Sequence, residues 1–128
     1  MQYLISSEDN VFIIHIDHNN KMSYIMNDGS KSTIDISNFE LDLFRLLLDG
    51  SSFSAPLSVF DIESKLSSYN ISLFTVKNTV SSLRSKLRLI TKTEISHKFI
   101  HNINRKGYYI NAKLINNVSS ATKIKKNY

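Results

Sequence analysis

Arg105 and Lys106 stand side by side in a predicted turn, and Gly107 follows them directly. Isoleucines on both sides of this turn are typical of a β-hairpin, and the glycine suits its tight bend. Two cations at the tip of a hairpin are suited to contact phosphate groups. A solvated turn explains the same residues when the stretch is taken alone, but the rest of the chain favours phosphate contact.

A helical pattern upstream of this turn has the same character. Its apolar residues recur at the spacing of one buried helix face: Val76, Val80, Leu83, Leu87 and Ile90. The opposite face has no carboxylate and carries Lys77, Asn78, Ser81, Ser82, Arg84, Ser85 and Arg88. Exposed helices usually mix charges, because each oppositely charged pair four residues apart stabilises the helix by ~0.2–0.5 kcal/mol. The absence of acids therefore favours a face that lies beside phosphates.

The charge of the chain is divided between its two parts. Residues 1–50 carry three Lys/Arg against eight Asp/Glu, whereas residues 51–128 carry thirteen against three. From Lys77 onward there are twelve cations and one acid, Glu94. Such an asymmetry creates a positive field over one part of the fold and attracts a polyanion. Nucleic acid is the first candidate partner, and anionic lipid is the second.

The elements that must position these residues begin with strands. β-branched residues separated by turn compositions predict a small antiparallel meander of three or four strands, from the segments 3–5, 11–16, 22–26 and 31–36. After residue 36 the spacing of apolar residues changes to the spacing that is typical of helices. Ser37 and Glu40 form a capping box before a helix over residues 38–49, which Gly50 is predicted to end.

Two further helices and a hairpin complete the predicted α+β fold. Ser58 and Asp61 resemble a second cap before a short helix, which residues 67–70 break. The longer basic helix follows, and the segments 99–103 and 108–112 form the hairpin. Tyr108 is predicted to pack in the core, whereas Tyr109 faces either DNA or solvent. We expect one domain over residues 1–115 and a polar, basic tail over residues 116–128.

Composition argues against several classes of function. The 128-residue chain has no cysteine, which removes disulfides, thiolate metal sites and cysteine nucleophiles. No apolar run approaches the ~18 residues of a membrane span. Two histidine pairs, His15 with His18 and His97 with His101, do not converge on extended segments, so we expect no metal site. No motif of catalysis or of cofactor binding is recognisable, and we expect neither an enzyme nor a cofactor.

The order of these elements is that of a winged helix-turn-helix with an N-terminal antiparallel sheet. Over roughly residues 10–114 the chain resembles the DNA-binding domain of OmpR/PhoB-type regulators, and within it the ToxR-like branch. The residues that carry the resemblance are the pattern "VSSLRSKL" at residues 80–87, Thr75 with Val76, and Phe99 with Ile100 leading to "RKGY" at residues 105–108.

The resemblance implies a recognition helix in the major groove and a wing at the adjacent minor groove. Asn78 is then the candidate reader of an adenine, and the cations mainly position the protein on phosphates. Serines replace the arginines that many relatives carry in the middle of the helix. The implied DNA-binding residues are Thr75, Lys77, Asn78, Ser81, Ser82, Arg84, Arg88, Asn104, Arg105 and Lys106.

The resemblance also implies partners and a location. The chain is expected to be a bacterial transcription regulator, an activator, that binds double-stranded promoter DNA in the cytoplasm. The loop at residues 67–73, with Tyr69 and Asn70, is expected to contact RNA polymerase. The division of charge leaves two readings of the acidic half: it is simply solvated, or it docks against the basic side of a neighbouring protomer, so that two copies sit head to tail on repeated DNA sites.

Two questions stay open at the level of sequence. Either the chain is complete, or it is the N-terminal part of a longer ToxR-like protein that is tethered to a membrane. The alternative function is a winged-helix module that binds a protein or an anionic membrane without sequence-specific binding of DNA.

Overall fold

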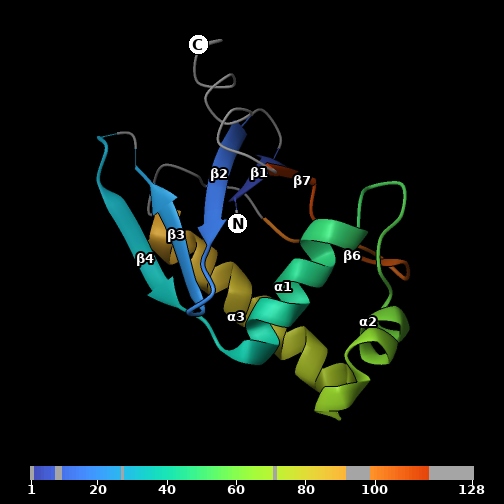
Figure 1. The fold of residues 1–128 in the computed structure, drawn as a ribbon. Coiled ribbons are helices and arrows are strands. Elements are labelled where there is room, and N and C mark those ends of the chain that lie inside the picture. Colours follow the sequence, from blue (N-terminus) through green and yellow to red (C-terminus); the bar gives the residue numbers. More distant parts are fainter. Residues whose placement is uncertain (1, 8–9, 27, 71, 92–98, 116–128) are drawn as a thin grey trace.

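A computed structural model of the chain describes residues 2–7, 10–26, 28–70, 72–91 and 99–115. They form an α+β fold in which an N-terminal antiparallel sheet precedes three helices and a C-terminal hairpin (Figure 1). This order confirms the predicted fold class at the level of its elements. The predicted tail from residue 116 lies outside the described residues.

The larger sheet has five antiparallel strands in the order β4-β3-β2-β1-β7. Its members are β1 (Gln2–Ser7), β2 (Asn10–Ile16), β3 (Lys21–Ile25), β4 (Lys31–Asp35) and β7 (Ala112–Ile115). The first four follow one another along the chain as the predicted meander. The fifth was not predicted, and it pairs with β1 so that Gln2 lies opposite Ile115.

The smaller sheet is the hairpin of β5 (His101–Ile103) and β6 (Gly107–Tyr109). The prediction that the second hairpin strand extends to Ala112 is wrong. After Tyr109 the chain leaves the hairpin, because the backbone N–H of Ile110 donates to Ser51 Oγ at 3.0 Å. Ala112 then pairs with Ile5 of β1.

Capping boxes start the first two helices, α1 (Asn38–Gly50) and α2 (Val59–Lys65), as the sequence predicts. Gly50 does not end α1 as predicted, since it is the last helical residue and Ser51 forms the cap. Ser51 Oγ donates to the carbonyl of Leu47 at 2.6 Å, which satisfies one of the carbonyls left free at a helix end. A short 3₁₀ helix, η1 (Ser67–Tyr69), and Asn70 in a left-handed conformation separate α2 from α3 (Leu73–Thr91).

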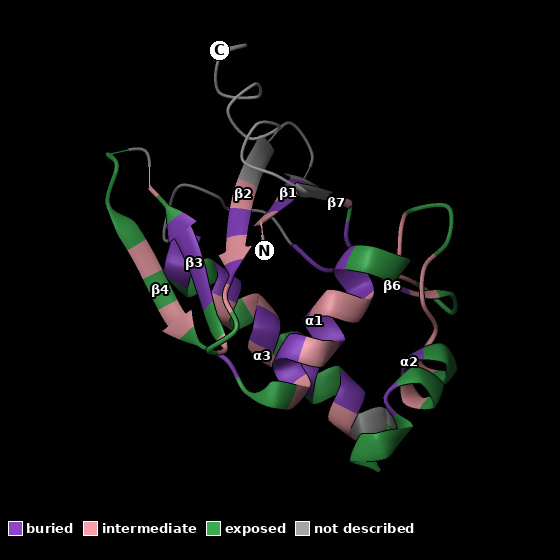
Figure 2. Cartoon of the chain, in the orientation of Figure 1, coloured by how far each residue is buried: buried purple, intermediate pink, exposed green. Residues whose placement is uncertain are grey.

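The core lies where the larger sheet, α1 and α3 meet (Figure 2). Every residue of the predicted apolar stripe of α3 is buried, which confirms its orientation. Tyr108 is 7% exposed and belongs to this core, as predicted. α3 runs diagonally past the sheet and α1, while α2 and the hairpin lie together at the right of Figure 1. None of the described helices is long and apolar enough to cross a membrane.

Candidate nucleic-acid interface

The predicted DNA-binding residues of α3 lie on its polar side and form two stripes. Lys77, Ser81, Arg84 and Arg88 recur at i, i+4, i+7 and i+11, so they share one line along the helix. Thr75, Asn78 and Ser82 form the second line. Lys77, Asn78, Ser81 and Arg88 are exposed, whereas Thr75, Ser82 and Arg84 are half-buried. The two stripes meet different neighbours.

The second stripe faces α1 across an open groove of about 530 Å³. All of its lining residues except Phe39 have polar side chains: Ser37, Phe39, Glu40, Thr75, Asn78, Thr79, Ser82 and Lys86. Thr75 and Asn78 are therefore accessible from the groove as well as from the outer side of α3. This position leaves the amide of Asn78 free to meet a base edge, because Asn78 is exposed and its side chain has no hydrogen-bond partner among the described residues.

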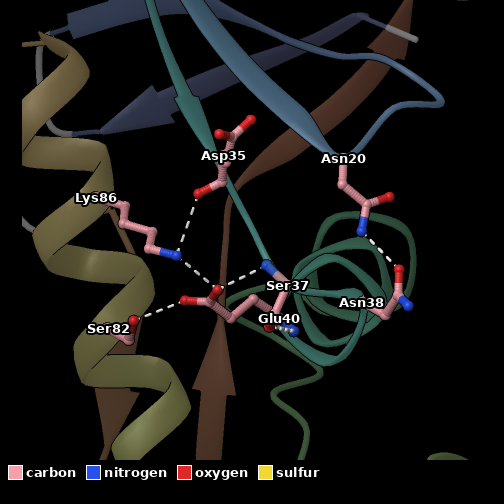
Figure 3. Close-up of polar contacts among 7 residues, drawn as sticks. All are labelled: Asn20, Asp35, Ser37, Asn38, Glu40, Ser82 and Lys86. Carbon is pink, nitrogen blue, oxygen red and sulfur yellow. Dashed lines mark hydrogen bonds and ion pairs between the residues drawn. The ribbon is translucent and has the colours of Figure 1, made fainter.

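Ser82 has a partner inside the protein. Its hydroxyl donates to Glu40 Oε2 at 2.6 Å, while Lys86 Nζ contacts Glu40 Oε1 at 2.6 Å (Figure 3). Lys86 also donates to the carbonyl of Asp35 at 3.2 Å. Burial acts to raise the pKa of Glu40, but hydrogen bonds from Lys86, Ser37 and Ser82 outweigh it and hold that pKa below its ordinary value. Glu40 thus joins the start of α1 to the middle of α3.

Arg84 likewise bonds within the chain. Its Nε and Nη2 both donate to the carbonyl of Ile100, at 3.0 and 2.6 Å. Burial lowers the pKa of Arg84; Tyr108 opposes this shift and the charge of Arg88 adds to it. Ile100 directly precedes β5, so this contact fixes the start of the hairpin against α3.

The tip of the hairpin presents the remaining predicted residues to solvent. Asn104, Arg105 and Lys106 are all exposed. The backbone N–H of Lys106 donates to the carbonyl of Ile103 at 2.9 Å and closes the turn. Arg105 has a φ of +64°, an uncommon left-handed conformation for a residue with a side chain. The turn therefore directs two cations away from the body of the protein.

The hairpin is also fastened to the loop that precedes α2. Leu57 and Tyr108 exchange two backbone hydrogen bonds of 2.8 and 2.9 Å. Tyr109, whose surroundings the sequence leaves open, is half-buried and packs between the rings of Phe53 and His101. The centroid of the Tyr109 ring lies 5.8 Å from that of Phe53 and 4.9 Å from that of His101. These contacts place the hairpin beside the loop that precedes α2, on the right of Figure 1.

Several exposed cations of this region have no carboxylate partner among the described residues. Within the described part of the chain, ion pairs join Lys21 to Asp35 and Lys86 to Glu40. Lys77, Arg105 and Lys106 have no ion-pair partner among those residues. Their positive charge is therefore available to an anionic ligand.

The predicted polymerase-contact residues, Tyr69 and Asn70, lie near the first turn of α1. The Tyr69 ring packs edge-on against Phe39 with centroids 5.0 Å apart, and its hydroxyl donates to Asp42. That hydrogen bond raises the pKa of Tyr69, with a smaller contribution from burial. Tyr69 and Asn70 are both exposed. The turn is thus held in place while its outer surface stays accessible.

The histidines show no sign of a metal site where the structure describes them. No group of three or more His, Cys, Asp or Glu residues gathers among the described residues. His101 stacks on Tyr109, and His97 lies outside the described residues.

Two residues at the interface have roles that sequence reasoning missed. Glu40 was assigned only to the cap of α1, and Arg84 only to phosphate. The sequence around Lys86 gives no signal of its pairing with Glu40, since the two residues are 46 positions apart.

No family model, curated protein or solved structure matches the chain. The function proposed for the chain therefore depends on this geometry.

Proposed function

We propose that the chain is a winged helix-turn-helix domain that binds double-stranded promoter DNA and regulates transcription. In this proposal α3 is the recognition helix and the β5–β6 hairpin is the wing. The observation that carries it is the linking of α3, whose polar face has no acid of its own, to a hairpin whose cations have no ion-pair partner among the described residues. The two bonds from Arg84 to the carbonyl of Ile100 link α3 to the residue that precedes this hairpin.

The residues divide into positioning and reading groups. Lys77, Arg88, Arg105 and Lys106 meet phosphates, which fix the orientation of the protein without reading sequence. Asn78 reads an adenine, and the hydroxyls of Thr75 and Ser81 bond to bases or phosphates. By resemblance to OmpR/PhoB-type and ToxR-like regulators, the turn with Tyr69 and Asn70 meets RNA polymerase. The same resemblance supports a bacterial activator that acts from the cytoplasmic side. The division of charge between the two parts of the chain supports head-to-tail association on DNA.

The combined substitution of Arg105→Ala and Lys106→Ala tests the proposal. It should weaken binding to all duplexes and reduce the slope of log K against log salt by roughly 1.8, because each lost phosphate contact removes ~0.9 from that slope. Titrations of labelled duplex between 50 and 200 mM salt measure the change. Lys21→Ala with Lys31→Ala removes the same charge from the sheet and should leave the slope unchanged.

Two outcomes would contradict the proposal. An equal loss with both pairs of substitutions would indicate a diffuse effect of net charge rather than contact by the wing. Displacement of duplex DNA by anionic lipid vesicles, with no displacement of vesicles by duplex, would favour the membrane-binding alternative.

Asn78→Ala should change which sequence is preferred. Loss of a bidentate contact to adenine removes about 1–3 kcal/mol of discrimination at one position of the site. Selection from randomised duplexes, followed by sequencing, measures the preference. Ser85→Ala, on the same exposed side, serves as the control. An unchanged preferred sequence in the Asn78 variant would remove Asn78 from the reading group.

A further inference from the structure

The contact between Arg84 and Ile100 joins two parts of the proposed DNA-binding surface. Two nitrogens of the guanidinium converge on one carbonyl oxygen, with the shorter bond at 2.6 Å. Ile100 is fully buried and immediately precedes the first strand of the hairpin. The donor comes from the middle of α3 and the acceptor from the root of the hairpin, so their bond sets the distance between these elements.

The second strand of the hairpin is fastened separately. Tyr108 bonds to Leu57, and Gly107 passes within van der Waals contact of the same loop. Neither of these contacts involves α3. The bonds from Arg84 are therefore a polar link from α3 to the residue at which the hairpin begins, separate from those that hold its second strand.

A guanidinium is suited to this role. Its planar fork offers Nε and Nη2 in a fixed geometry, and a charged donor makes a stronger bond than a neutral one. A lysine at the same position retains the charge but replaces the fork with a single rotatable ammonium. The substitution Arg84→Lys thus separates charge from geometry.

We propose that Arg84 is a positioning residue that fixes the wing against the recognition helix, and that it acts on DNA binding through the wing rather than as a phosphate contact. This inference rests on the proposed function. It assigns Arg84 a role that differs from the one implied by family resemblance. Lys77, Ser81 and Arg88 of the same stripe remain on the exposed side of α3 and keep their proposed contacts with DNA.

A double-mutant cycle tests the proposal. Arg84→Lys should weaken duplex binding by about tenfold in the otherwise unchanged protein, because the wing is no longer held in register. In the protein that already carries Arg105→Ala and Lys106→Ala, the same substitution should weaken binding by less than about twofold. Arg88→Lys, at a proposed phosphate contact outside the wing, is the control, and it should weaken binding by the same factor in both backgrounds. The proposal would be overturned if Arg84→Lys weakened duplex binding by the same factor with and without the two cations of the wing.

A second measurement does not depend on DNA. Amide hydrogen exchange in the hairpin of the free protein, followed by NMR, should be at least about fivefold faster in Arg84→Lys, and unchanged in Arg88→Lys. Arg84→Met retains the apolar stem and provides a second variant with the same expectation. Hairpin exchange at the rate of the unsubstituted protein in both Arg84 variants would overturn the proposal. If the unsubstituted protein binds no duplex, the proposed function fails, and the exchange rates alone decide the role of Arg84.

Discussion

Gly107→Ala is expected to destabilise the protein by roughly 3–5 kcal/mol, from backbone strain and from overpacking together. A Cβ at this position would lie 2.1 Å from the carbonyl oxygen of Leu57 and 2.7 Å from the nitrogen of Ser58. Both neighbours are backbone atoms in a loop that also bonds to Tyr108. The φ of +139° is itself unfavourable for alanine. Relief of the clash requires the hairpin to move away from α2.

Gly29→Ala is the matched control for this substitution. Gly29 also has a positive φ, of +90°, but a Cβ there meets no atom within 4 Å. Both substitutions reduce the entropy of the unfolded chain to a similar extent, so this contribution cancels in their comparison. The control should cost only about 1 kcal/mol. Urea denaturation measures both free energies of unfolding, and equal values would show that the close approach of Gly107 to Leu57 is not structurally important.

Displacement of the hairpin by Gly107→Ala should also weaken duplex binding, even though no charge is lost. Arg105 and Lys106 would still be present but would no longer keep their position relative to α3. The loss should resemble that of the Arg105→Ala and Lys106→Ala protein in affinity. Retention of full affinity would imply that the wing tip contributes charge without a defined position.

Glu40→Gln is expected to lower the free energy of unfolding by roughly 2–3 kcal/mol at pH 7. The carboxylate accepts hydrogen bonds from Ser82, Lys86 and the backbone of Ser37 at once (Figure 3). An amide cannot accept all of these bonds, and it leaves the Lys86 ammonium, whose side chain is 25% exposed, without its counter-charge. Urea denaturation again measures the change.

A second capping box supplies the control. Asp61 caps α2 with the same reciprocal bonds to Ser58, both of 3.1 Å, but its side chain is exposed. No other helix is bonded to it among the described contacts. Asp61→Asn should therefore cost no more than about 1 kcal/mol. A cost equal to that of Glu40→Gln would show that the links from α1 to α3 contribute nothing beyond the cap.

The effect of Glu40 should depend on pH in a defined direction. Because the folded protein holds the pKa of Glu40 below its ordinary value, the charged carboxylate contributes stability that is complete above about pH 4.3. This contribution is lost as the pH falls through the lowered pKa. The difference in stability between the unsubstituted protein and Glu40→Gln should shrink between pH 5 and pH 3. If this difference in the free energy of unfolding stayed constant from pH 5 to pH 3, the charge on Glu40 would not be the source of the stability.

Local patterns were sufficient to predict most of the elements. The capping boxes at Ser37 and Ser58 involve residues three positions apart, and the apolar stripe of α3 repeats within a single helix. Such signals lie within a few residues of each other, so the sequence contains them directly. The element order of the α+β fold followed from them.

Long-range contacts were not predictable in the same way. The pairing of β7 with β1 joins the two ends of the described chain, and Ala112 reads locally as a continuation of the hairpin. The polar face of α3 was assigned from its composition, but composition does not distinguish an exposed arginine from one that turns inward to a carbonyl. The hydrogen-bond partners of Ser82, Arg84 and Lys86 are distant in the sequence, and only folding brings them close.

The pairing of β1 with β7 has a consequence for biosynthesis. β7 is made more than a hundred residues after β1, whereas the neighbouring strand β2 follows β1 directly. Until residue 115 has been made, one side of β1 exposes unpaired backbone groups along a strand edge, a feature that recruits neighbouring chains. The sheet is therefore closed only after all the other described elements have been synthesised.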